Sequence, residues 1–235
     1  MKRIFLVIFV FLISIVVTSC GESTSEADSS INSNAQKETN NESNSKKEST
    51  NTKEIDKQYK ELSKPINIDG IGTATIIKSG YCDTFNLDGS DKESKPYKFS
   101  ELDFTVLQTQ VLTLDLNQAG KAFFNANGPL QWITFDVRYY NHSSADVLID
   151  NSFSSLSTSQ FENLSFEPTL SDDFGGLENS IKPGETKEGV ISFIDNTNSP
   201  FSSASLDIAI KYEEQKSFKF EYLPLKDAIE KDFTN

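Results

Sequence analysis

The sequence predicts an all-β protein folded as an antiparallel β-sandwich. First, apolar residues recur at every second position in several segments after about residue 65, as in strands with one buried face. Second, Gly, Pro, Asn and Ser occupy the connections between these segments, where the chain must reverse. Third, no helical pattern longer than about ten residues interrupts the series, which favours sheet packed on sheet.

The clearest alternation lies in the middle of the chain, where Ile133, Phe135 and Val137 share one face of a strand and Thr134 and Asp136 share the other. The same reasoning predicts strands in residues 73–81, 131–139, 190–194, 206–212 and 218–222. Residues 104–116 form a longer stretch whose alternation slips near residues 107–111, which predicts a β-bulge or two consecutive strands. The eighteen Phe residues suit a core between two sheets.

Two further segments concern the edges of this domain. Leu225, Ala228, Ile229 and Phe233 have helical spacing and predict a short C-terminal helix. The insertion at residues 117–128 is either a loop or an extra pair of strands.

The N-terminus has the pattern of a lipoprotein signal peptide. Lys2 and Arg3 precede an apolar run that stops at Thr18-Ser19-Cys20, which gives a charged region, an apolar region and a small-residue cleavage site. A Cys at this place resembles the bacterial lipobox, which implies that Cys20 carries a diacylglyceryl group and an acyl chain such as palmitate. The alternatives are a plain signal peptide and a single membrane span. The length of the apolar run is at the short limit for a membrane-spanning helix.

Three parts are therefore expected: a signal peptide at residues 1–19, the lipidated Cys20 with a disordered tether at residues 20–64, and the sandwich domain at residues 65–235. The tether is rich in Ser, Asn, Thr, Glu and Lys and cannot bury enough apolar surface to order itself. The predicted location is the extracytoplasmic face of the cell membrane, held there by the lipid.

The charge of the chain excludes some partners. The formal net charge is −13, and it becomes −15 when Lys2 and Arg3 leave with the signal peptide. Phosphate recognition needs clustered Lys and Arg, so we expect no nucleic-acid partner and no attraction to an anionic bilayer surface. Solubility, weak binding of cations and basic partners are compatible with this charge. The sequence does not indicate an oligomeric state.

Cys82 is the only Cys left once Cys20 is lipidated, so an intramolecular disulfide and a Cys-based metal site are both excluded. A buried apolar residue, an exposed thiol and an intermolecular disulfide remain open for it.

Three segments resemble a known group of domains. They are residues 132–141 running into an Asn-His-Ser-Ser turn, Ile181-Lys182-Pro183-Gly184-Glu185-Thr186 before residues 189–193, and residues 78–85 before a strand. Together they resemble the immunoglobulin-like domains of unknown function in Gram-positive lipoproteins, a group similar to the mycobacterial immunoprotective extracellular protein. The likeness covers roughly residues 70–212. It implies an immunoglobulin-like antiparallel β-sandwich outside the cytoplasm and transfers no catalytic residue.

Signals of catalysis are poor. His142 is the only His and lies in a polar turn, where a solvated loop residue is expected. Neither Gly-x-Ser-x-Gly nor His-Glu-x-x-His is present. We therefore predict no enzyme, no catalytic residue, no cofactor and no metal site.

Acidic loops are candidate metal sites, and aromatic residues are candidate contact surfaces. Asp83, Asn86, Asp88 and Asp91 surround Gly89, but the EF-hand Glu is missing at the required offset, so an acidic turn is expected rather than calcium. Asp172-Asp173 has the same interpretation. Trp132 has the parity of outward residues and is either an exposed anchor or packed under a loop, while Phe123-Phe124 forms an apolar tip or a cover for the sandwich.

The function predicted from these observations is a non-catalytic binding or interaction module at the cell envelope, with an envelope protein as its partner. The alternative is a small-ligand or divalent-cation binder that serves as a sensor or transporter accessory.

Overall fold

The computed structural model describes residues 42–82, 93–171, 179–211 and 214–234. The chain divides into two units, residues 1–50 and residues 51–235. The second unit contains the sandwich, and the predicted signal peptide and Cys20 lie outside the described residues.

Most of the described strands belong to one antiparallel sheet, and the remaining pair forms a second, small sheet. The large sheet contains β1 (Ile66–Ile68), β2 (Gly72–Cys82), β3 (Tyr97–Lys98), β4 (Leu102–Leu116), β5 (Leu130–Asn141), β7 (Ser155–Thr158), β8 (Leu164–Ser165), β10 (Thr186–Asp195), β11 (Ser203–Lys211) and β12 (Glu214–Pro224). The small sheet pairs β6 (Val147–Ile149) with β9 (Asn179–Ile181).

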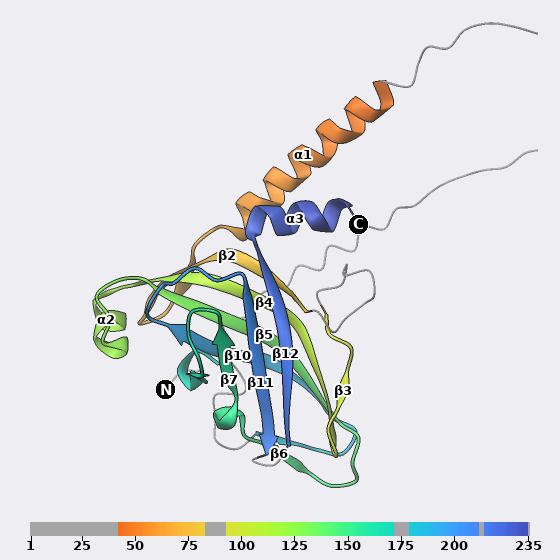
Figure 1. Ribbon diagram of the computed structural model, residues 1–235, viewed down its shortest axis with the longest axis vertical. Helices are drawn as coiled ribbons and strands as arrows, with labels where there is room; N and C mark the ends of the chain where they lie inside the picture. Colours follow the sequence, from red (N-terminus) through yellow and green to blue (C-terminus); the bar gives the residue numbers. More distant parts are fainter. Residues whose placement is uncertain (1–41, 83–92, 172–178, 212–213, 235) are drawn as a thin grey trace, which may run out of the picture. The chain divides into compact units, whose positions relative to one another are not determined.

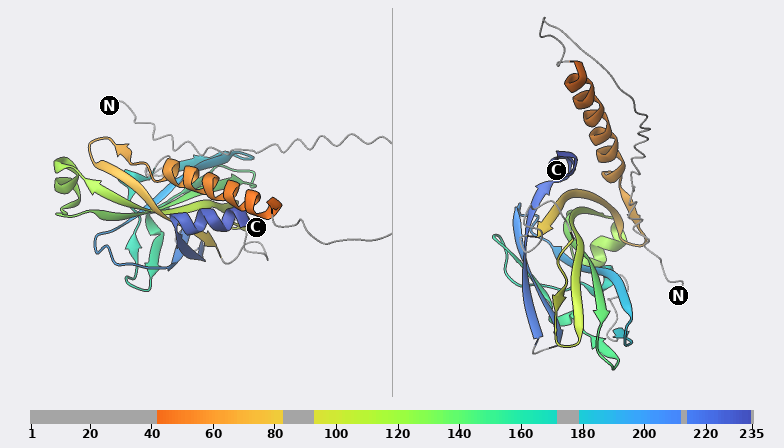
Figure 2. Two further views of the ribbon diagram at one scale, coloured as in Figure 1. Left: turned by 90° about the horizontal axis from the view of Figure 1, so that it is seen from above. Right: turned by 90° about the vertical axis from the view of Figure 1, so that its right-hand side faces the viewer.

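The large sheet folds over on itself into two layers. Its strand order is β10-β5-β4-β2-β12-β11-β7-β8, and β2 joins the layer of β4, β5 and β10 to the layer of β11 and β12 (Figures 1 and 2). A bridge between Phe166, just after β8, and Phe193 on β10 brings the two ends of the sheet together. Beside it, the Glu167 N–H donates to Ser192 O at 2.8 Å. The antiparallel sandwich predicted from the sequence is confirmed.

Aromatic rings from the two layers meet in the core. Phe104 on β4 lies 5.3 Å from Phe218 on β12, and Phe135 on β5 lies 5.1 Å from Phe220, both measured between ring centroids. Each of these side chains is at most 2% exposed. The predicted inward face of β5 is confirmed, because Ile133, Phe135, Val137 and Tyr139 are all fully buried.

The slip of alternation in residues 104–116 is a β-bulge within one strand. The pairing of β4 with β5 shifts between Val106 and Gln108, so Leu107 is the extra residue.

The C-terminal helix is confirmed as α3 (Leu225–Thr234), with Leu225, Ala228 and Ile229 buried. The Tyr81 hydroxyl on β2 donates to Ala228 O at 3.0 Å and holds the helix against the sheet.

The insertion at residues 117–128 contains a helix, α2 (Gln118–Phe124), rather than a strand pair. Asn117 caps its start by accepting from the Gly120 N–H at 2.9 Å, and Asn125 ends it in the left-handed conformation. Gly120 is required for close packing, because an added Cβ would lie 2.2 Å from Ile71 O.

A longer helix, α1 (Glu42–Leu62), occupies part of the segment in which we expected a disordered tether. Its residues are mostly Lys, Glu, Ser, Asn and Thr, and Lys57 pairs with Glu54 one turn away at 3.4 Å. Lys and Glu have high helix propensity and support each other at this spacing, which the compositional argument did not weigh. Two short 3₁₀ helices, η1 (Asn151–Phe153) and η2 (Pro168–Leu170), complete the described elements.

Candidate functional site

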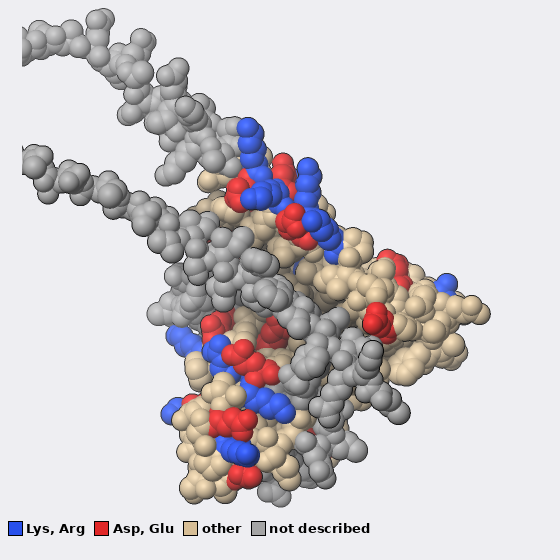
Figure 3. All heavy atoms as spheres, turned by 180° about the vertical axis from the view of Figure 1, so that it is seen from behind, with Lys and Arg blue, Asp and Glu red and all other residues tan. Residues whose placement is uncertain are grey.

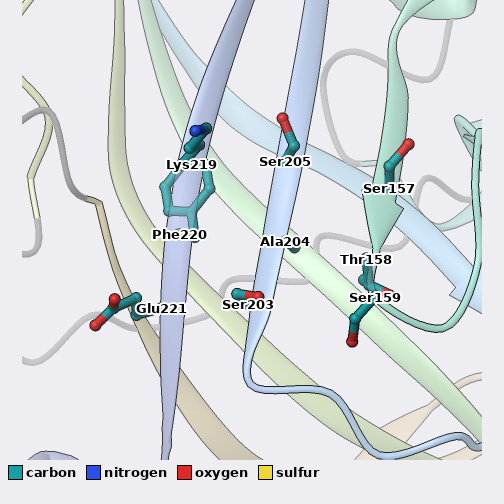
Figure 4. Close-up of a pocket in the computed structure, with 9 residues that line it drawn as sticks. All are labelled: Ser157, Thr158, Ser159, Ser203, Ala204, Ser205, Lys219, Phe220 and Glu221. Carbon is teal, nitrogen blue, oxygen red and sulfur yellow. The ribbon is translucent and has the colours of Figure 1, made fainter.

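A shallow polar hollow lies on the outer face of β7, β11 and β12 (Figure 4). We call it the serine hollow. Its volume is about 440 Å³ and it is open to solvent over much of its surface. It is lined by Ser157, Thr158, Ser159, Ser203, Ala204, Ser205, Lys219, Phe220 and Glu221.

Strand register explains why polar groups gather there. Ala204 and Leu206 on β11 point into the core, so Ser203 and Ser205 point outward. Ser205 stands between its cross-strand partners Ser157 and Lys219, and Ser203 stands beside Glu221. The hollow thus offers small hydroxyl groups with one basic and one acidic side chain. Such a surface can hydrogen-bond a polar ligand or a partner backbone.

A charged cluster lies on the outer face of the other layer. Arg138 on β5 donates through Nε to Glu188 on β10 at 2.6 Å and through its terminal nitrogen to Glu93 at 3.0 Å. Asp136 is on the same face, and burial, followed by the negative charge of Glu188, raises its pKa to about 6. In Figure 3, basic and acidic side chains of the described residues are mixed over this side of the molecule.

His142 lies directly after β5, exposed as expected for a loop residue. Its Nε2 is 3.6 Å from Asp103 Oδ1 and 3.3 Å from Phe99 O. No described contact joins His142 or Asp103 to a Ser or Cys nucleophile. Among the described residues, no group of three or more His, Cys, Asp or Glu side chains could hold a metal ion.

Trp132 packs rather than acting as an exposed anchor. It is 1% exposed, and its Nε1 donates to Ser192 Oγ at 2.9 Å. Cys82 is a buried thiol of the core, the first of the three possibilities. The predicted acidic loops at residues 83–91 and 172–173 lie outside the described residues.

Three large apolar side chains among the described residues are about half exposed or more. Phe123 on α2 is 58% exposed, and its ring packs edge-on against Phe124 at 4.8 Å between centroids. Leu148 on β6 is 60% exposed, and Phe153 on η1 is 49% exposed. Sequence reasoning singled out Phe123 but missed Leu148 and Phe153, whose short elements have too few residues to show a period.

No described helix combines the length and the apolar composition that a membrane crossing requires. The lipid anchor on Cys20 stays a prediction from the sequence, because residues 1–41 lie outside the described part of the chain.

No model of a known protein family matches the sequence, and no curated protein matches it. Among solved structures, the chain is similar to a functionally unknown protein from Listeria monocytogenes, with 16% identity, 66% of this chain and 88% of the other covered, and a TM-score of 0.45. It is also similar to a conserved hypothetical protein from Bacillus anthracis, with 12% identity, 60% and 97% covered, and a TM-score of 0.37. A candidate lipoprotein from Bacillus subtilis aligns at 12% identity over 54% of this chain and 38% of the other, with a TM-score of 0.39. At these TM-scores the likenesses do not assign the chain to a group.

Proposed function

We propose that this protein is a membrane-anchored lipoprotein of the extracytoplasmic face that acts as a non-catalytic interaction module. The observation that carries the proposal is the order of the first twenty residues: Lys2 and Arg3, an apolar run broken only by Ser14, and then Thr18-Ser19-Cys20. Two acyl chains on the diacylglyceryl group give stable anchoring, because one chain alone binds only marginally.

The anchor is tested by replacing Cys20 with Ser in the full chain expressed in a bacterium. The variant should lose incorporation of labelled palmitate and move from the membrane fraction to the soluble fraction. Cys82→Ser is the matched control, since it removes the other thiol of the chain, and it should keep both label and membrane location. A Cys20→Ser protein that keeps the label would overturn the proposal.

The interaction surface that we propose is formed by Leu148 on β6 and Phe153 on η1, which we call the β6–η1 patch. Both large apolar side chains are about half exposed or more, and they come from consecutive elements of the chain. Exposed apolar side chains of this kind mark protein interaction sites, because a partner that covers them removes apolar surface from water. The partner proposed is a second protein of the cell envelope.

A photo-reactive phenylalanine analogue placed at position 148 tests the patch in intact cells. We expect one discrete cross-linked product, which Phe153→Ser should reduce. The same analogue at the exposed position 115 on β4 is the control and should give no such product. Equal cross-linking from both positions would contradict the assignment of this surface.

The serine hollow supports a second candidate function, the binding of a small polar ligand. Its volume of about 440 Å³ is within the range of ligand sites, and Ser205 stands directly between Ser157 and Lys219. Sugars and peptides of the cell envelope are the probes to titrate against the full chain by fluorescence. Binding that is lost in Ser205→Leu but kept in Phe153→Ser would favour this function over the first.

A further inference from the structure

Two buried oxygen atoms without a hydrogen-bond partner lie on facing strands at one end of the sandwich. Asp195 is the last residue of β10 and pairs directly with Gln131 on β5. Asp195 is 0% exposed and Gln131 is 8% exposed. Within the described part of the chain, neither Asp195 Oδ2 nor Gln131 Oε1 has a hydrogen-bond partner. Direct cross-strand partners project to the same face of a sheet, so the two side chains are neighbours on that face.

Hydrogen bonds to Asp195 Oδ1 and from Gln131 Nε2 orient the two side chains. Asp195 Oδ1 accepts from the Thr197 N–H at 2.8 Å and from the Thr197 hydroxyl at 2.7 Å, which occupies that oxygen in the turn after β10. Gln131 Nε2 donates to Ser199 O at 3.4 Å. This bond assigns the nitrogen to the Ser199 side of the amide, which leaves Oε1 as the acceptor without a partner.

The negative charge of Asp195 has no counter-charge among the described ion pairs, which do not include it. Lys78 on β2 is a basic residue that reaches the loop between β10 and β11. Its Nζ, however, donates to Phe201 O and lies 4.9 Å from the centroid of the Phe201 ring. A carboxylate removed from water without a positive partner is strongly unfavourable.

We propose that Asp195 Oδ2 and Gln131 Oε1 hold a monovalent alkali cation, with sodium as the probe. Carboxylate, amide and backbone oxygens are ligands for hard cations. Ser199 O has a second lone pair that makes it a third candidate ligand. One buried carboxylate balances one positive charge, whereas calcium would leave an excess positive charge in the interior. The cation would fasten the β10–β11 loop to the start of β5.

The test is a thermal melt of the full chain in non-ionic detergent micelles, in sodium, potassium, calcium or choline chloride at one ionic strength. Sodium should raise the Tm by about 2–4 °C over choline, which is too large to enter a buried site. Broadening of the ²³Na resonance by the protein should report the binding directly. Equal Tm values in sodium and choline, or a stabilisation by calcium alone, would overturn the proposal.

Three variants separate binding from folding. Asp195→Asn keeps the size and the turn acceptor but removes the charge, so the sodium shift and the ²³Na broadening should both disappear. Asp115→Asn is the matched control. Asp115 is an exposed carboxylate at the end of β4 that pairs with the start of β5, and its loss should leave the sodium shift intact. Gln131→Glu adds a second carboxylate and should move the preference from sodium to calcium. A sodium shift that survives in Asp195→Asn contradicts the site.

Discussion

Trp132 on β5 donates its indole N–H to Ser192 on β10 at 2.9 Å, diagonally across the strand pair. Ser192 in turn donates its hydroxyl proton to Leu170 O at 2.6 Å, and its backbone N–H donates to Ser171 Oγ at 3.0 Å. The segment around η2 is thereby fastened over the outer face of β10. This cover explains why Trp132 is buried although its strand parity points it away from the core.

Replacing Ser192 with Ala should destabilise the protein by about 1–3 kcal/mol, because the buried indole N–H and the Leu170 carbonyl would both lose their partner. Urea unfolding of the full chain, followed by the fluorescence of its single Trp, measures the effect. Ser203→Ala changes an exposed hydroxyl and should stay within about 0.5 kcal/mol of the parent protein. Equal losses in the two variants would argue against the buried chain of hydrogen bonds.

Gly80 on β2 is required by the side chains that face it. An added Cβ would lie 2.5 Å from Thr109 Cγ2 and 2.6 Å from Tyr222 Cε1, and those two residues share a buried hydrogen bond of 2.8 Å. Gly80→Ala should therefore cost about 1–3 kcal/mol through overpacking. Gly128→Ala, where a Cβ has open space, is the control for the loss of a glycine and should not destabilise. The midpoint of urea unfolding distinguishes the two outcomes.

Asn141, at the end of β5, joins three segments of the chain. It is 0% exposed, and its Nδ2 donates to Ala145 O and Ile181 O, each at 2.8 Å. Its Oδ1 accepts from the Ser143 N–H at 2.8 Å. Asn141→Asp keeps the shape but sets a carboxylate against two carbonyl oxygens.

This substitution should cost about 2–4 kcal/mol, because the buried oxygen that replaces the amide nitrogen would face the carbonyl oxygens of Ala145 and Ile181. Hydrogen exchange gives the sharper readout, since the backbone amides of the β6–β9 pair should lose protection before those of β5. The exposed Asn127→Asp carries the same change of charge and should leave exchange in β6 unaltered. Uniform loss of protection throughout the sandwich would contradict a local role for Asn141.

The strands predicted well from the sequence are those with one buried face, because burial of that face makes apolar and polar residues alternate. Phe135 and Val137 alternate with polar neighbours because only one face of that stretch of β5 meets the opposite layer. The same rule failed to decide between the two possibilities for Trp132, since the segment that covers it lies some forty positions away in the chain. Periodicity contains no information about such long-range cover.

The candidate sites were less accessible to sequence reasoning. Asp195 and Gln131 are ordinary polar residues in the sequence, and only the pairing of β5 with β10 makes their unpartnered oxygens neighbours. The serine hollow likewise depends on register, because Ser157 and Ser205 belong to separate strands. Short elements such as β6 and η1 have too few residues to show a pattern, so the exposure of Leu148 and Phe153 could not be anticipated.

The last prediction concerns pH and the carboxyl group of Asp136. Burial raises its pKa from 3.8 to about 6, and the negative charge of Glu188 acts in the same direction. The outer face around it also contains Gln108 and Val190, its cross-strand partners, and the guanidinium of Arg138. The folded protein therefore binds a proton that the unfolded chain releases between about pH 4 and pH 6. The resulting stabilisation is present below pH 4 and is lost as the pH rises through 6.

Asp136→Asn imitates the protonated acid and should remove this pH dependence. The difference in free energy of unfolding, variant minus parent, should rise by up to about 2 kcal/mol between pH 4 and pH 7. Taking the difference cancels the titration of groups common to both proteins. Asp115→Asn, at an exposed position, should give a difference that is flat over the same range. A flat difference for Asp136→Asn would mean that its carboxyl group titrates as it does in the unfolded chain, and a falling difference would mean that folding lowers its pKa.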